Sequence, residues 1–221
     1  MKTTESLEHS EQSASGVPSC STPDPIALVR EEHCLQMELC DLLEAIADGL
    51  PSVFDRDLAA IAVSMLQGSV AAHTKFEDEA LFPVLEQRLG PTDPVMEALA
   101  CLKEEHDRDE DIVRELTVAL RTALATGSVQ APETLGYVLR GYFESQRRHI
   151  AWENRIVLPA AEASLTSDDL NALQVWIMQS QHPRCSKQSM LTIRAARSGS
   201  SVCKDCQSSV APTEFKKRGD L

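Results

Sequence analysis

The chain has 221 residues, enough for one domain with a hydrophobic core and additional segments at its ends. It carries 21 basic and 34 acidic residues, a net charge of −13, which argues against nucleic acid or an anionic membrane as its partner, because both attract basic surfaces. Aromatic residues make up only 4% of the chain, which disfavours an all-β sandwich. No apolar stretch approaches the roughly 20 residues that span a bilayer, and the polar start has no hydrophobic signal region, so we expect a cytoplasmic protein.

The acidic excess is confined to the first 181 residues. Residues 182–221 contain eight Lys or Arg and three acidic residues, a charge of +5, which leaves −18 for residues 1–181 (−13 − 5). Residues 1–22 are rich in Ser, Thr and Glu, a composition typical of disorder. We therefore predict one folded domain over residues 23–181, with a disordered segment at 1–22 and a basic, cysteine-containing, disordered tail at 182–221.

Helix start and stop signals divide the folded part into four long helices and a short one. Asp-Pro pairs at 24–25 and 93–94 are typical helix starts, and Gly or Pro residues follow the predicted ends. The predicted helices span about 25–47, 55–88, 94–125 and 132–163, with a shorter one from 167 that ends before 183. Long amphipathic helices with short connections predict an all-α fold, an antiparallel up-down four-helix bundle with a short extra C-terminal helix.

An internal repeat is the most informative feature of the sequence. The run EEH at 31–33 returns at 104–106, and the pattern His-x3-Glu-x5-Pro at 73–83 returns at 149–159. The chain therefore contains two helical hairpins of one design. Each hairpin has one histidine on its first helix and a His-x3-Glu pair on its second helix.

The repeated polar residues interrupt apolar stripes at helical spacing, so they should point into the bundle. Residues four apart share a helix face, and all six side chains are expected to meet at mid-height. A single core histidine is usually a hydrogen-bonded structural residue, but burying four imidazoles and two carboxylates is costly unless cations compensate them. Nitrogen and carboxylate ligands without thiolate suit iron, manganese or zinc. The predicted ligands of this dinuclear metal site are His33, His73, Glu77, His106, His149 and Glu153.

These motifs resemble those of the hemerythrin-like family, also called the HHE cation-binding domain, over residues 24–163. The resemblance rests on EEH at 31–33, HTKFEDEALFP at 73–83, EEH at 104–106 and HIAWENRIVLP at 149–159. It implies a four-helix bundle that holds two non-haem iron ions, bridged by two carboxylates and by an oxo or hydroxo group. By position, one pair of histidines would bind on each half, and the two glutamates would be the bridges. The pairs are His33 with His73 and His106 with His149.

The set of ligands implied by the resemblance departs from that of the oxygen-carrying hemerythrins. Those proteins have a fifth histidine one turn after the third-helix histidine, where this chain has Glu110. Four histidines and two glutamates are more similar to the di-iron proteins that repair iron–sulfur clusters under nitrosative or oxidative stress. Such repair proteins usually carry an amino-terminal segment with paired cysteines, whereas residues 1–22 contain only Cys20, which counts against repair.

Two kinds of function follow from the predicted metal site. Four histidines could leave an open position on each iron, which favours reaction with O2, NO or peroxide over reversible oxygen carriage. The leading hypothesis is a di-iron protein that binds or reacts with O2 or NO in sensing, storage or stress protection, and a binding protein is favoured over an enzyme. The alternatives are an iron donor for cluster repair and a weak di-iron peroxidase or oxidase.

Other residues near the predicted ligands each have two interpretations. Glu110 is either a further ligand or proton acceptor, or a solvated acid within the charged run at 107–111. Tyr142 lies on the same face as His149 and either forms a hydrogen bond near the site or is an ordinary core aromatic residue. Acidic residues next to the ligands in sequence project about 100° away, so we expect them at the surface or as hydrogen-bonding partners of the ligands. These neighbours are Glu32, Asp78 and Glu105.

The basic tail contains a spacing that fits a small zinc site. Its four candidate ligands are His182, Cys185, Cys203 and Cys206. The alternatives are a redox-active pair formed by the last two cysteines, and a disordered tail in which the cysteines are incidental.

Overall fold

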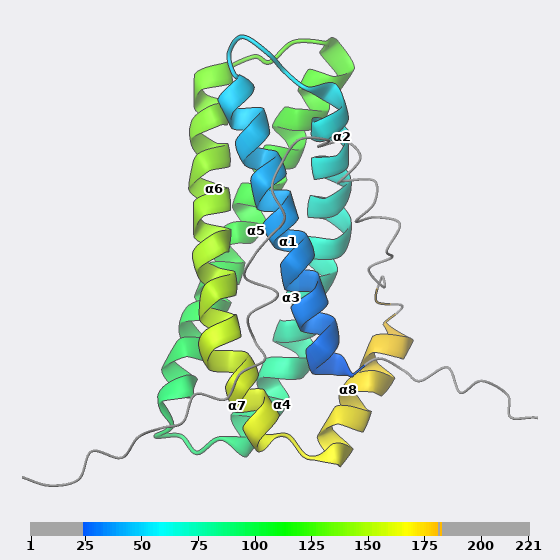
Figure 1. Ribbon diagram of the computed structural model, residues 1–221, viewed down its shortest axis with the longest axis vertical. Helices are drawn as coiled ribbons and strands as arrows, with labels where there is room; N and C mark the ends of the chain where they lie inside the picture. Colours follow the sequence, from blue (N-terminus) through cyan, green and yellow to red (C-terminus); the bar gives the residue numbers. More distant parts are fainter. Residues whose placement is uncertain (1–23, 181, 183–221) are drawn as a thin grey trace, which may run out of the picture.

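The computed structural model describes residues 24–180 and residue 182. In this part of the chain all regular structure is helical, and the helices form the antiparallel four-helix bundle predicted from the sequence, with a short extra helix (Figure 1). The first long helix is α1, the second comprises α2 to α4, the third is α5, the fourth comprises α6 and α7, and the short one is α8. Their bounds are α1 Pro25–Gly49, α2 Arg56–Met65, α3 Ala71–Phe76, α4 Phe82–Arg88, α5 Pro94–Thr126, α6 Pro132–Trp152, α7 Leu158–Ser164 and α8 Ser167–Gln179.

The helix ends follow the signals read in the sequence. Asp24 and Asp93 each precede a proline, and each carboxylate accepts a hydrogen bond from the backbone N–H two residues later, at 3.0 and 2.9 Å. At the other end of α5, Gly127 adopts a left-handed conformation with φ of 76°, which glycine tolerates without steric cost. Short connections between these ends make the chain run up, down, up and down along the bundle (Figure 1).

Three π-helical turns interrupt the second and fourth long helices. These turns are η1 Leu66–Val70, η2 Glu77–Leu81 and η3 Glu153–Val157. The η2 and η3 turns each begin at a repeated glutamate and end two residues before a repeated proline, Pro83 or Pro159. Because proline has no N–H, it cannot donate the next α-helical hydrogen bond. Both glutamates are therefore carried at equivalent, locally widened turns, which are frequent at functional sites.

The apolar core is divided into two clusters with a polar layer between them. One cluster contains the C-terminal half of α1, with Leu39, Leu43 and Ile46 fully buried. The other contains the N-terminal half of α1, with Ile26 and Val29, and reaches α8 through Leu173 and Ile177. The repeated histidines and glutamates occupy the layer between these clusters, at mid-height in the bundle as predicted.

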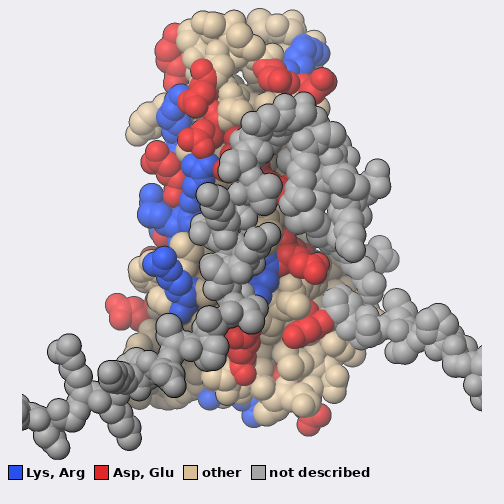
Figure 2. Space-filling view, in the orientation of Figure 1, with Lys and Arg blue, Asp and Glu red and all other residues tan. Residues whose placement is uncertain are grey.

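The visible surface carries both signs of charge (Figure 2). Arg147 on α6, for example, pairs with Asp41 and Glu44 of α1 at 2.8 and 2.6 Å. These three side chains are half-buried, so solvent still screens the ion pairs and they contribute little to stability. Within the described residues, no helix combines the length and apolar character that crossing a membrane requires.

Candidate metal centre

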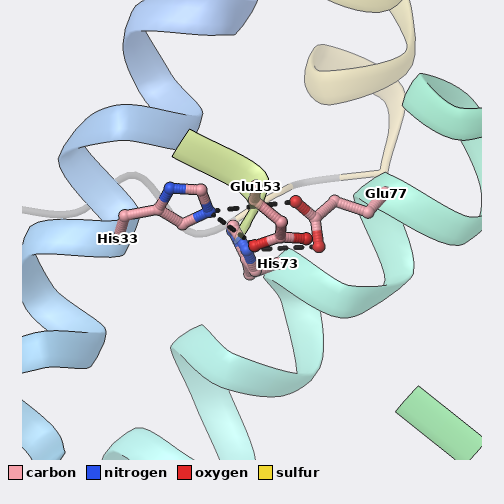
Figure 3. Close-up of side chains that lie close together, drawn as sticks. All are labelled: His33, His73, Glu77 and Glu153. Atoms are coloured by element: carbon pink, nitrogen blue, oxygen red, sulfur yellow. Dashed lines mark ion pairs between the residues drawn. The ribbon is translucent and has the colours of Figure 1, made fainter. Parts of the chain in front are cut away.

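The six predicted ligands converge in the interior of the bundle. The four long helices supply them, and all six are at least 93% buried. Their exposed fractions are 2% for His33, 3% for His73, 1% for Glu77, 7% for His106, 5% for His149 and 0% for Glu153. Figure 3 shows how the His33 and His73 rings, from α1 and α3, point at the carboxylates of Glu77 and Glu153.

The ligand atoms form two overlapping groups of four. His33 and His73 belong to one group and His106 and His149 to the other, while both glutamates belong to both groups. Within each group the candidate ligand atoms lie within 4.8 Å of one another. This arrangement is consistent with a dimetal site in which each hairpin would supply two imidazoles to one position and one carboxylate to both.

The distances place nitrogen and oxygen atoms around the same points. Glu153 contacts His33 and His149, with Oε–Nε2 distances of 3.1 and 3.2 Å. Glu77 contacts His73 and His106 at 3.3 and 3.6 Å. The Nε2 atoms of His106 and His149 are themselves 3.1 Å apart. All four imidazoles therefore present Nε2 to the centre.

Several of these buried atoms lack a hydrogen bond, which tests whether the residues fit metal ions. Among the described residues, no carboxylate oxygen of Glu77 or of Glu153 has a partner in hydrogen-bond geometry, although histidine nitrogens lie within ion-pair distance, and Nε2 of His33 has none either. Leaving such atoms unsatisfied in a protein interior is costly. Cations placed between them would satisfy all of them at once, so the donor set fits two ions bound by nitrogen and carboxylate oxygen.

Each histidine ring is oriented by a hydrogen bond at its other nitrogen, Nδ1. Glu32 contacts His73 at 2.8 Å, and Glu105 occupies the equivalent position on His149 at 2.8 Å. These pairs lie within one hairpin. The remaining pairs cross between hairpins and are Asp78 with His106 and Asn154 with His33, both at 2.9 Å. Partners of this kind fix the ring orientation and the tautomer of metal-binding histidines.

Comparison with family models gives the chain its place among known proteins. Residues 24–161, more than half of the chain, match the hemerythrin HHE cation-binding domain. The chain belongs to this family. Comparisons with curated proteins and with solved structures give no match. The resemblance predicted from the sequence is thereby confirmed, and the two hairpins are the two halves of an HHE domain.

Outside the residues that match the HHE domain, His182 makes a contact that the sequence did not indicate. Its ring is buried against Phe76 and Trp176, with ring centroids 5.8 and 6.4 Å away. Its Nε2 lies 2.6 Å from Glu32, whose other oxygen holds His73. His182 therefore supports Glu32, the hydrogen-bond partner of a candidate metal ligand, and the tail zinc site predicted for it stays a prediction. The other three residues of that site, Cys185, Cys203 and Cys206, lie outside the described residues.

Of the two residues near the site with two interpretations, Glu110 is exposed and Tyr142 is buried. The Glu110 side chain is 80% exposed and lies 3.6 Å from Arg114 on the solvent side of α5. Tyr142 is buried on α6, and its hydroxyl has no hydrogen-bond partner among the described residues. The acidic neighbours of the ligands accept hydrogen bonds from them, which is one of the two roles predicted from the sequence.

Asn154 was missed by the sequence analysis, although a signal for it exists. It follows Glu153 as Asp78 follows Glu77, so the repeat itself relates the two residues. Both contact the first-helix histidine of the opposite hairpin. Asn154 is neutral whereas Asp78 is acidic, so the sequence analysis did not recognise the two positions as equivalent.

The electrostatics of the site favour the charged forms of His149, Glu153 and Glu32. Burial disfavours a charged imidazole, but the nearby Glu153 carboxylate outweighs this effect and raises the pKa of His149 to about 9. Burial raises the pKa of Glu153, whereas His149 and His33 lower it more strongly, to well below its usual range. The pKa of Glu32 is also lowered, because its hydrogen bonds with His182 and His73 outweigh burial.

Metal affinity is expected to rise with pH between about 6.5 and 9. A histidine must lose its proton to bind metal, and His149 in the metal-free protein holds its proton up to about pH 9. The same raised pKa stabilises the metal-free fold below pH 6.5, and this stabilisation is lost as the pH rises through 9. Competition titrations with Zn2+ should give roughly tenfold tighter binding per pH unit for each proton released. An affinity independent of pH over this range would contradict the ion-paired metal-free state.

Replacing Glu32 with glutamine is expected to weaken metal binding by about 10- to 100-fold, as is typical when a ligand loses its hydrogen-bonding partner. Glu32 is 3% exposed and accepts hydrogen bonds from both His73 and His182. Isothermal titration with Zn2+ measures the effect. Glu31→Gln is a matched control, because the same change is made at the adjacent, exposed position. An equal loss of metal affinity in the two variants would show that the removed charge, and not the contact with His73, causes the weaker binding.

Proposed function

We propose that this protein is a non-haem di-iron protein that binds or reacts with O2 or NO, in sensing, storage or stress protection. The observation that carries the proposal is the pair of overlapping four-residue groups that share Glu77 and Glu153. Both glutamates are at most 1% exposed and have oxygens without hydrogen bonds among the described residues. Iron suits a donor set of imidazole nitrogen and carboxylate oxygen.

Different residues of the chain would have different roles in the metal centre. The four Nε2 atoms and the two shared carboxylates would hold the ions, and bound iron would supply redox chemistry and open positions for a small ligand. The carboxylates would balance charge as the ions change oxidation state. The contacts at Nδ1 fix the orientation of each imidazole, with Nε2 facing inwards. The apolar clusters above and below the layer limit the access of water to the site.

The burial of the site supports ligand binding over iron donation. All six ligands are at least 93% buried, so releasing iron to another protein would require the bundle to open. A small molecule, in contrast, has a route to three of the histidines through a cavity that they line. We therefore place reaction with small ligands ahead of cluster repair.

The proposal is tested by spectroscopy of the iron-loaded protein. Anaerobic ferrous protein is mixed with O2 and, separately, with NO, and near-ultraviolet and visible spectra are recorded. We expect a charge-transfer absorption that develops with O2 and a distinct spectrum with NO, each saturating at a fixed ratio to the chain. Iron-loaded protein that responds to neither ligand would refute the proposed function while leaving the metal centre in place.

A further inference from the structure

A cavity of about 350 Å³ lies beside the His/Glu cluster. It is lined by three of the candidate ligands, His73, His106 and His149. Its exposed lining residues belong to α3, η2 and α5, and its buried lining residues include Gln36 of α1 and Tyr142 of α6. The cavity therefore connects the surface of the bundle with the metal centre.

Two buried polar groups in this cavity lack partners within the described part of the chain. The hydroxyl of Tyr142 and the amide nitrogen of Gln36 have no hydrogen bond to any described residue, although these side chains are only 1% and 5% exposed. Buried donors in folded proteins are nearly always paired, so each unpaired one calls for an explanation. Gln146, which lines the same cavity, is paired, because its amide donates to Asp109.

The charges around the cavity indicate what it admits. Five acidic residues line it, and Lys75 is the one Lys or Arg among the lining residues. The acidic residues there are Asp78, Glu79, Asp107, Asp109 and Glu110. A negative rim repels anions and leaves small neutral molecules unaffected. Burial and the nearby Asp109 hold the pKa of Tyr142 well above its usual range, so its hydroxyl stays protonated and can donate.

We propose that Tyr142 and Gln36 are ligand-binding residues that donate hydrogen bonds to a small neutral molecule held in this cavity beside the metal centre. The ligand is a small neutral molecule, diatomic to tetra-atomic, whose atoms can accept a hydrogen bond. Nitric oxide, dioxygen and hydrogen peroxide are examples. The inference rests on the proposed function and adds to it the side chains that select and retain the ligand. Such donors act strongly in a dry site because water does not compete with them.

The test uses nitric oxide as the probe and ferrous-loaded full-length protein under anaerobic conditions. Tyr142→Phe and Gln36→Leu are each expected to weaken NO binding about 3- to 10-fold, mainly through faster dissociation, as for the loss of one hydrogen bond. Matched controls are Tyr137→Phe, at a tyrosine that is 79% exposed, and Gln87→Leu, at an exposed glutamine. Both controls should bind NO as the unmodified protein does.

A second readout separates ligand binding from a structural role. Because the Tyr142 hydroxyl makes no hydrogen bond within the described part of the chain, its removal should leave the unfolding temperature of the metal-free protein unchanged or raise it. Unchanged NO dissociation in both variants, with two irons still bound, would overturn this inference and leave the proposed function standing. A lower unfolding temperature without any change in NO binding would also overturn it. An unmodified protein that binds no iron would overturn both proposals.

Discussion

Replacing Glu77 with glutamine is expected to abolish binding of the second metal ion and to weaken binding of the first by more than about 100-fold. Glu77 belongs to both four-residue groups, so the change removes a ligand and a negative charge from both positions at once. Removing only the hydrogen-bonding partner of a metal ligand already lowers metal affinity about 10- to 100-fold. Native mass spectrometry during titration with Fe2+ or Zn2+ measures the number of bound ions and their affinities.

Glu144→Gln provides the matched control for the Glu77 variant. Glu144 is exposed on α6, and the same change there removes one charge without touching the buried layer. The control should bind two ions with unchanged affinity. A Glu77→Gln protein that still binds two ions as tightly as the control does would show that Glu77 is not shared between the two positions.

Removal of the metal ions is expected to lower the unfolding temperature by roughly 10 °C. Ions that bind only the folded state, at a free concentration about 1,000 times their dissociation constant, stabilise it by about 4 kcal/mol. For a domain of this size each kcal/mol corresponds to about 2–4 °C. Metal ions would also satisfy the glutamate oxygens and the His33 nitrogen that lack hydrogen bonds among the described residues. Thermal unfolding with and without a chelator measures the shift.

The Glu77→Gln variant again serves as the control for this second prediction. Its unfolding temperature should respond little to added metal, because it lacks the shared carboxylate. An equal metal-dependent shift in the variant and in the unmodified protein would place the stabilising ions elsewhere, for example on exposed carboxylates. Equal unfolding temperatures of chelated and loaded unmodified protein would contradict a metal site in the core.

The bundle and the six converging side chains were predictable because local signals specify both. Proline and glycine mark the helix ends, and periodicity assigns each histidine to a buried face. The repeat then relates the two hairpins without any knowledge of their packing. The pairing of His33 with His73, which the resemblance implied, is seen in the structure as two imidazoles sharing one group.

The contacts around the ligands were not predictable in the same way. The Nδ1 partners lie 28 to 121 residues away from their histidines, so each pair depends on which helices become neighbours. Position on the helix excluded Glu32 from the ligand set, but it did not reveal that Glu32 would be buried between His73 and His182. The π-helical turns also lack a residue signature of their own, and a continuous helix was expected in their place.

The central claim is that six side chains from two hairpins hold two metal ions close together. X-ray absorption spectroscopy of the iron-loaded protein, combined with its metal content, tests this claim most directly. We expect two irons per chain, with nitrogen and oxygen ligands and no sulfur. The iron–iron distance should be about 3–4 Å, as in other sites that hold two neighbouring metals. A single iron per chain without a neighbouring metal, or sulfur among its ligands, would contradict it.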